Sequence, residues 1–294
     1  MDYFLSKHTT QPWLLVLTKT IVFFLLFCFI TILVRNTISP LMITYDLNAL
    51  LTPFADLVPL GLLNSFFKRL SVCILTIAFY LIFTRFVDKQ PLRQTVFFPK
   101  TSIIKNILAG VSIVLLLIVL ASFIGTAIGL ITSEHFAPTP VSEMLAVVAL
   151  WLLIKLPTAI LEEVVFRGYI LQSLTKILNP NISVAISAIF FGLVHYPSST
   201  EVIITATIFG FFAGYLMLVY QNIYLPIALH WAGHTLGNVI YDPKILIITG
   251  KPVVLFNSFN ISLTRIFFFE MVVATIILII IKKLWLLDNY SKKN

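Results

Sequence analysis

The chain has 294 residues, of which 59% are hydrophobic and only 11% are charged, and its formal net charge is +8 at pH 7. Soluble globular domains have about twice that charged fraction, and no water-soluble fold buries the apolar surface implied by a mean hydropathy of +1.02. Lys and Arg lie in short clusters beside apolar runs, without a basic stripe carrying interleaved aromatics, so the composition excludes a soluble fold and argues against nucleic acid as a partner.

The apolar runs predict an all-α fold, a polytopic transmembrane helical bundle embedded in the lipid bilayer. A spanning helix needs about 20 mostly apolar residues. About eight runs meet or approach this length, in chain order 13–34, 70–86, 106–132, 143–161, 183–196, 201–220, 223–241 and 263–286. The first run is followed by Arg35 and Asn36 and not by the small residues of a cleavage site, so we interpret it as a retained span.

The distribution of basic residues predicts the orientation. Five of them lie from the end of the second run to the start of the third (Arg85, Lys89, Arg93, Lys100 and Lys105), and four lie at the end of the last run or after it, which places both termini in the cytoplasm. The segment 35–68 would then lie outside, as an interfacial helix or a loop on the membrane. The composition is compatible with a bacterial cell membrane. We divide the chain into spans one to three with the interfacial segment (1–142), a core of spans four to seven (143–241), and a loop with the last span (242–294).

Ionisable residues concentrate in spans four to seven. Each costs roughly 2.5–3.5 kcal/mol at mid-membrane, and the whole set would cost roughly 10 kcal/mol or more if it were unpaired. The residues are Glu162, Glu163, Arg167, His195, His230 and His234. Polar side chains also hold membrane helices together, but Ser, Thr and Gly do so at lower cost. The set therefore indicates a functional site.

Helical geometry organises this set. Glu163 and Arg167 are four positions apart, so they share a face and are expected to pair. Glu162 is rotated by about 100° and is expected to point into the bundle. His230, His234 and Asn238 repeat at every fourth position and form one polar stripe.

Glu and His in a low-dielectric pocket suit general acid and base catalysis. One carboxylate takes a proton from water, an imidazole orients the water or protonates the leaving amine, and a second His stabilises the oxyanion. Ser187, Ser198 and Ser199 have no nucleophile setting and are expected to be packing and loop residues, and Cys28 and Cys73 lie inside apolar runs. Direct attack by an activated water is therefore favoured over an acyl-enzyme.

A divalent metal such as zinc is the open alternative. His-x-x-x-His on a helix places two imidazoles on one face, so that His230 and His234 with His195 and Glu162 would supply ligands of suitable type. The familiar metalloprotease helix has Glu directly after the first His, where this chain has Trp231.

Taken in order, these motifs resemble those of the CPBP family, which comprises CAAX prenyl endopeptidases, bacteriocin-processing proteins and abortive-infection-type intramembrane proteases. The family pattern is Glu-Glu-x-x-x-Arg, then Phe-x-x-x-His, then His-x-x-x-Asn, on successive helices. The chain has all three in this order, over residues of about 143 to 241: Glu162-Glu163 with Arg167, Phe191 with His195, and His230 with His234.

The resemblance implies that Glu162 is the water-activating base with His195, that Glu163 and Arg167 support it, and that His230 contributes to the oxyanion site. It further implies a peptide or protein substrate in or at the membrane, lipidated in some relatives, with bacterial members acting in bacteriocin maturation, self-immunity or protein maturation. The departure is His234, where the family has Asn. An imidazole donates one hydrogen bond as an amide does, but the change leaves room for altered or lost activity.

Three functions follow from these observations. The leading hypothesis is an intramembrane endopeptidase, a hydrolase whose activity depends on glutamate or on a metal. A catalytically inactive membrane scaffold or immunity protein of the same fold is the second, and the His234 departure favours it. A proton-coupled transporter is the third, since Glu and His chains also form proton relays, but the sequence has no repeat symmetry of the transporter kind.

Overall fold

The computed structural model describes residues 12–44, 60–97, 102–127 and 141–241, and every regular element in these ranges is a helix. This confirms the predicted all-α fold. The elements are α2 (Trp13–Thr44), α4 (Leu60–Ile82), the π-helix η2 (Phe83–Val87), the 3₁₀ helix η3 (Leu92–Gln94), α5 (Ile103–Ala127), α6 (Val141–Glu163), the π-helix η4 (Val164–Ile170), α7 (Leu171–Leu174), α8 (Pro180–Leu193), α9 (Thr200–Tyr220) and α10 (Tyr224–Tyr241).

Several helices are long and apolar enough to cross a membrane, so the chain is an integral membrane protein. Within the described ranges there are four such segments, Trp13–Val34, Asn64–Val87, Ile103–Leu120 and Thr200–Tyr220, and α8 is a shorter apolar helix. The count of eight spans stays a prediction, because the run 263–286 lies outside the described residues. The orientation of the termini and the three-part division of the chain also stay predictions.

The first two helices are longer than the apolar runs that predicted them. The sequence placed their facing ends at residues 34 and 70, but α2 continues to Thr44 and α4 already begins at Leu60. Parts of the predicted 35–68 segment are therefore helical, and residues 45–59 lie outside the described part of the chain. The length of an apolar run reflects the thickness of the lipid layer that the helix crosses. The helix itself ends where its terminal backbone N–H and C=O groups find partners outside the helix.

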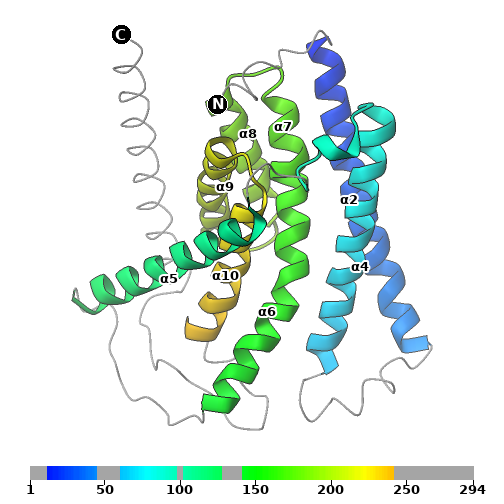
Figure 1. Ribbon diagram of the computed structural model, residues 1–294. Helices are drawn as coiled ribbons and strands as arrows, with labels where there is room; N and C mark the ends of the chain where they lie inside the picture. The colour runs from blue at the N-terminus through cyan, green and yellow to red at the C-terminus, as the bar shows by residue number, and fades with distance from the viewer. Residues whose placement is uncertain (1–11, 45–59, 98–101, 128–140, 242–294) are drawn as a thin grey trace, which may run out of the picture.

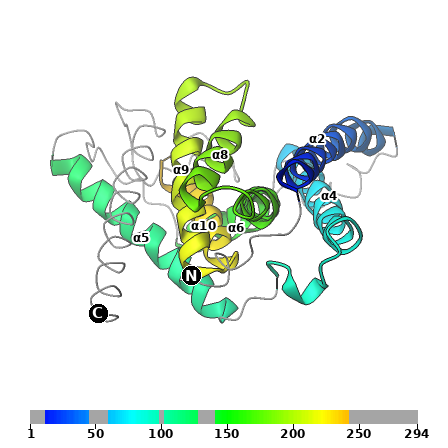
Figure 2. The same cartoon turned by 90° about the horizontal axis from the view of Figure 1, so that it is seen from above.

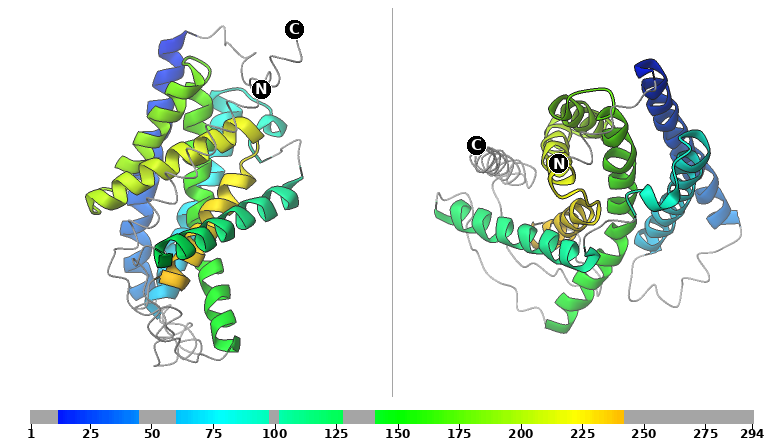
Figure 3. Two further views of the ribbon diagram at one scale, coloured as in Figure 1. Left: turned by 90° about the vertical axis from the view of Figure 1, so that its left-hand side faces the viewer. Right: turned by 45° about the horizontal axis from the view of Figure 1, so that its top comes forward.

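A continuous helix formed by α6, η4 and α7 lies at the centre of the molecule (Figure 1). α10 packs against α6 in the opposite direction, and α5 crosses α10 obliquely (Figures 1 and 3). Seen from above, α8 and α9 form a hairpin on one side of this centre, and the α2–α4 pair lies on another (Figure 2). α6 and α10 therefore have neighbours on several sides.

The α8–α9 hairpin depends on close backbone approach. A Cβ built on Gly210 of α9 would lie 2.8 Å from the Ala188 Cα of α8. Small residues allow membrane helices to approach closely, and the energy of association then comes from van der Waals contact. The same approach brings the Gly210 carbonyl to the polar centre described below.

Aromatic rings attach the α2–α4 pair to the central helix. The Phe23 ring of α2 is fully buried and stacks on the Tyr169 ring of η4, with centroids 3.9 Å apart. It also stacks on Phe79 of α4 at 5.0 Å and meets Phe83 of η2 edge-on at 5.4 Å. Contacts of this kind contribute to holding the pair against the central helix through packing.

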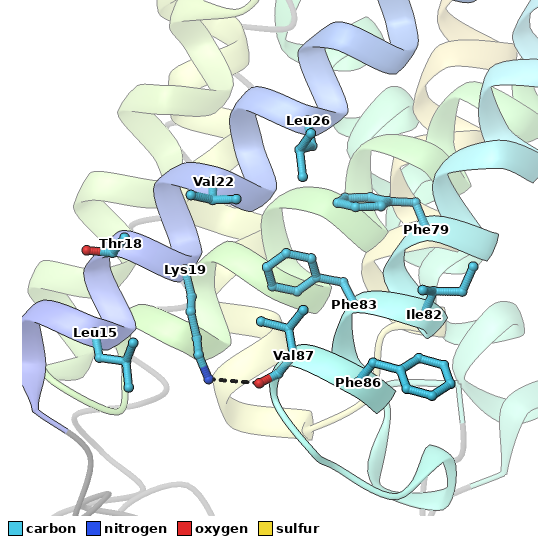
Figure 4. A pocket seen from close by; sticks show the side chains of 10 residues that line it. All are labelled: Leu15, Thr18, Lys19, Val22, Leu26, Phe79, Ile82, Phe83, Phe86 and Val87. Atoms are coloured by element: carbon cyan, nitrogen blue, oxygen red, sulfur yellow. Dashed lines mark hydrogen bonds between the residues drawn. The ribbon is translucent and has the colours of Figure 1, made fainter.

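A groove of about 570 Å³ lies between α2 and the end of α4 with η2 (Figure 4). Its walls are apolar except for Thr18 and Lys19. Lys19 Nζ donates to the Val87 carbonyl at 3.0 Å and pairs with Asp88 at 3.3 Å. No Glu or His lines the groove, so it is separate from the ionisable cluster.

Candidate active site

The two adjacent carboxylates lie at the junction of α6 and η4. Glu163 is the last residue of α6, and the π-helical segment that follows, Val164–Ile170, is buried throughout. Its widened turn is held from α8, where Ser187 Oγ donates to the Phe166 carbonyl at 3.1 Å. This contact confirms the prediction that Ser187 is a packing residue. Short π-helical segments inside α-helices occur frequently at functional sites.

Glu163 and Arg167 form the predicted pair. Arg167 Nη1 donates to Glu163 Oε1 at 3.0 Å, and the two side chains are 1% and 0% exposed. Arg167 Nη2 also donates to the Gly210 carbonyl at 3.4 Å. The guanidinium carbon lies 4.4 Å from the ring centroid of Phe191 and 5.4 Å from that of Phe209. The charge is therefore compensated by a carboxylate, a carbonyl and two aromatic faces.

His230 of α10 joins both carboxylates. Its Nδ1 is 2.8 Å from Glu163 Oε1, and its Nε2 is 3.7 Å from Glu162 Oε2. A carboxylate paired with a guanidinium accepts hydrogen bonds, so Nδ1 carries the hydrogen. Glu163 thereby fixes the orientation of the imidazole, and the opposite nitrogen faces Glu162.

The two carboxylates have different environments. Glu163 is completely buried and shares Oε1 between Arg167 and His230, whereas the Glu162 side chain is 20% exposed. The Oε2 atoms of both are buried and accept no hydrogen bond from the described part of the chain. Glu163 is thus occupied by protein contacts, and Glu162 is the carboxylate that remains accessible.

His195 lies just beyond α8 and is half-buried. Its Nδ1 is 2.8 Å from the Phe191 carbonyl, and its ring meets the Phe191 ring with centroids 5.1 Å apart. The Phe191 ring also contacts the His230 ring, with centroids 5.9 Å apart. Between the described atoms, His195 and Glu162 form neither a hydrogen bond nor an ion pair, so it is His230 that lies beside Glu162.

His234 continues the polar face of α10. Its ring stacks on that of His230, with centroids 4.7 Å apart and planes at 30°. The helical stripe predicted from the spacing is therefore formed by these two residues. Asn238 lies one turn further along α10, but its side chain lies outside what the structure describes.

The proposed metal ligands are not gathered around one point. Among the described residues, no three His, Cys, Asp or Glu side chains are arranged to hold a metal ion. The two nitrogens of His230 already face Glu163 and Glu162. The arrangement of Glu162, His195, His230 and His234 therefore does not fit a shared zinc, and no step of the reaction below is assigned to a metal.

Sequence reasoning did not identify the walls of the site. Phe209 approaches His230 with centroids 4.7 Å apart, and Gly210 supplies a carbonyl to Arg167. Both residues come from a stretch of α9, residues 208–214, that is apolar and carries no polar signal. The packing of α9 against α8 and η4 decides which of its residues face the charges.

Comparison with known families now identifies this centre. Residues 144–236 match the family model described as type II CAAX prenyl endopeptidase Rce1-like, and this segment contains all six predicted site residues. No curated protein and no solved structure matched the chain. The match confirms the resemblance drawn from the three motifs. The chain is an integral membrane protein, and its residues 144–236 are similar to the type II CAAX prenyl endopeptidase Rce1-like family.

Proposed function

We propose that the chain is an intramembrane endopeptidase in which Glu162 activates the attacking water. The observation that supports this assignment is the division of labour between the adjacent carboxylates. Glu163 binds Arg167 and His230, whereas Glu162 keeps a buried oxygen without a hydrogen bond and retains access to the exterior. Two carboxylates with separate roles set by their environments are typical of general acid and base catalysis.

In the proposed reaction, Glu162 removes a proton from water as the water oxygen attacks the carbonyl carbon of the scissile peptide bond. The carbonyl oxygen becomes an oxyanion, and the C–N bond then breaks while the proton passes from Glu162 to the leaving amine. The products are a new carboxyl group and a new amino group. No covalent enzyme intermediate forms.

His230 is the proposed oxyanion donor, as its place in the family pattern implies. Glu163 holds Nδ1, so Nε2 faces the space beside Glu162. The proposed role requires an imidazole that donates from Nδ1 to Glu163 and from Nε2 to the oxyanion. The imidazole then stabilises negative charge that develops next to the base. His195 contacts the same Phe191 ring as His230, and its proposed role is to contact the substrate or the water.

The substrate is a peptide or protein reached from the membrane, in CAAX-type processing or in the processing of bacteriocins and other peptides with self-immunity. The family domain supports the substrate class. Lipidation of the substrate, a bacterial membrane and cytoplasmic termini belong to the proposal.

An experiment with membranes tests this function. Wild type and Glu162→Gln are expressed at equal levels and incubated with small membrane-associated peptides, prenylated and unprenylated, and the fragments are identified by mass spectrometry. The expected result is fragments from wild type alone. Equal amounts of the same fragments from both proteins would contradict the role of Glu162 as the catalytic base.

The inactive scaffold is the second candidate, because His234 stands where the family has Asn. The same assay with His234→Asn separates the two. Cleavage only after this substitution would mean that the wild-type protein has lost its protease activity through His234. Cleavage by wild type would mean that the His234 imidazole can replace the family's Asn in the reaction. A transporter would instead show Glu162-dependent flux in liposomes without any peptide product.

A further inference from the structure

The groove between α2 and the end of α4 with η2 is apolar but carries one ion pair (Figure 4). Lys19 extends from α2, donates from Nζ to the Val87 carbonyl at 3.0 Å and lies 3.3 Å from Asp88 Oδ1. The two charged side chains are 16% and 10% exposed. An ammonium carries three donors, and Lys19 has no further acceptor in the described part of the chain. At least one donor is therefore left for a ligand.

The ion pair lies near the membrane ends of the two spans that form the groove. The first span begins at Trp13 and the second ends at Val87. Trp13 is exposed, as expected for an aromatic residue at the boundary between lipid and water. Lys19 lies a rise of about 9 Å further along α2, and long helical side chains lean back towards the N-terminus. The Lys19 ammonium therefore lies close to the depth of the lipid headgroups.

The apolar part of the groove has the length of one lipid leaflet. On α2 its wall reaches from Leu15 to Leu26, which corresponds to about 16 Å along the helix, close to half of a hydrocarbon core about 30 Å thick. Ile82 and Phe86 on the opposite wall are exposed. The volume of about 570 Å³ lies within the range of sites that bind small molecules. These dimensions fit one acyl chain that enters beside the ion pair and runs towards the middle of the membrane.

The charges at the headgroup end favour an anionic lipid. Asp88 balances Lys19, whereas Arg85 and Lys89 beside it are exposed and form no ion pair within the described ranges. Basic residues next to a membrane span attract anionic headgroups. The predicted orientation also places this end of the spans at the cytoplasmic face, where anionic lipids are concentrated. A phosphate that accepts from Lys19 would therefore lie in a region of net positive charge.

Asp88 also connects the groove with the central helix. The Tyr169 hydroxyl of η4 interacts with Asp88, and the Tyr169 ring stacks on Phe23 of α2. η4 directly follows Glu163, the last residue of α6. A ligand that holds α2 and the end of η2 together is therefore expected to stabilise the contact between the α2–α4 pair and the helix that carries the carboxylates.

We propose that this groove binds one anionic phospholipid, with one acyl chain between α2 and the end of α4 and with its phosphate on Lys19. The lipid has a structural role, because it fills the open side of the α2–α4 pair. The proposal does not depend on the proposed function, since every residue of the groove lies outside the segment 144–236 that the family model matches.

Native mass spectrometry of the purified, delipidated full-length protein in detergent micelles tests the site. The protein is titrated with phosphatidylglycerol or with phosphatidylcholine of identical acyl chains. Wild type is expected to bind one phosphatidylglycerol about five- to thirtyfold more tightly than phosphatidylcholine, the factor for one or two basic residues beside an anionic headgroup. Equal binding of the two lipids by wild type overturns the proposal.

Two sets of variants locate the bound lipid. Val22→Trp fills the groove from an exposed position and is expected to weaken phosphatidylglycerol binding about tenfold or more through lost van der Waals contact with the acyl chain. Val119→Trp, at an exposed position of α5, is the matched control and keeps the wild-type affinity. Unchanged binding by a folded Val22→Trp protein overturns the proposal.

The exposed charges give a test that does not alter the groove itself. Arg85→Gln with Lys89→Gln is expected to bring the ratio of the two lipid affinities to within about twofold of one, because it removes the charges that attract an anionic headgroup. Lys105→Gln, an exposed position in the first turn of α5, is the control and keeps the wild-type ratio. A lipid preference that survives the double substitution overturns the proposal. Displacement of the bound lipid by a prenylated peptide, abolished by Val22→Trp, would identify the groove as a substrate site and also overturn it.

Discussion

Replacing Arg167 by Met tests whether the buried ion pair holds the site together. The guanidinium is 1% exposed and contacts Glu163 Oε1, the Gly210 carbonyl and the Phe191 ring. Methionine keeps much of the volume but leaves the Glu163 carboxylate buried, with His230 as its only described partner. Breaking one side of a buried pair costs about 3–5 kcal/mol, so we expect the free energy of unfolding to fall by that amount.

The measurement is an SDS titration of purified protein in mixed micelles, followed by tryptophan fluorescence. Trp151 and Trp231 lie on the two helices that meet at the site and report on their separation. Arg167→Lys keeps the charge but loses the fork that reaches Gly210, at an expected cost of about 1.5–3 kcal/mol. Arg85→Met, at an exposed position, is the control and is expected to change stability by less than about 0.5 kcal/mol.

The double variant Arg167→Met with Glu163→Gln completes the argument. If the loss in the single variant comes from an uncompensated buried charge, neutralising Glu163 recovers part of it. The two changes should then deviate from additivity by about 1–3 kcal/mol. A single Arg167→Met variant as stable as the Arg85 control, or strict additivity in the double variant, would refute the reasoning.

The remaining predictions concern catalysis, packing and metal. His230→Gln is expected to lower kcat about 10²- to 10⁴-fold, the range for loss of one acid–base or oxyanion group, and equal rates for wild type and His230→Gln on one peptide would contradict its role. Gly110→Ala places a Cβ 2.7 Å from the Ala228 Cβ where α5 crosses α10, and should destabilise by about 1–3 kcal/mol. Gly233→Ala, with no atom within 4 Å of its Cβ, should be neutral or stabilising by up to about 1 kcal/mol. Equal losses of unfolding free energy in the Gly110 and Gly233 variants would show that crowding is not the cause. Treatment with 1,10-phenanthroline should leave the cleavage rate within twofold of the untreated enzyme, whereas inhibition reversed by zinc would contradict the ligand geometry.

The helical fold and the pairing of Glu163 with Arg167 could be predicted from the sequence because both follow from local rules. Apolar runs specify membrane helices by length, and a four-residue separation places two side chains on one face of a helix. The stacking of His234 on His230 follows from the same spacing. Segment ends were less predictable, and α2 and α4 extend by about ten residues beyond their apolar runs.

The tertiary partners could not be predicted in the same way. Spacing on α10 shows that His230 faces a neighbour but not which one, and the resemblance paired Glu162 with His195. In the structure Glu162 lies 3.7 Å from His230, and the Phe191 ring contacts both His195 and His230. The contact between Arg69 and Thr158 joins residues 89 positions apart, which no local pattern encodes. Such contacts depend on how α4, α9 and α10 pack around α6.

The central claim is that Glu162 is the base of a peptidase, and the most direct test is the kcat/KM of purified wild type and Glu162→Gln on one identified peptide. The SDS titration described above is run on both proteins, so that a loss of activity is not a loss of folding. The account predicts a fall of about 10²- to 10⁴-fold or more with unchanged stability. A folded Glu162→Gln protein that cleaves the peptide within tenfold of the wild-type rate would contradict it.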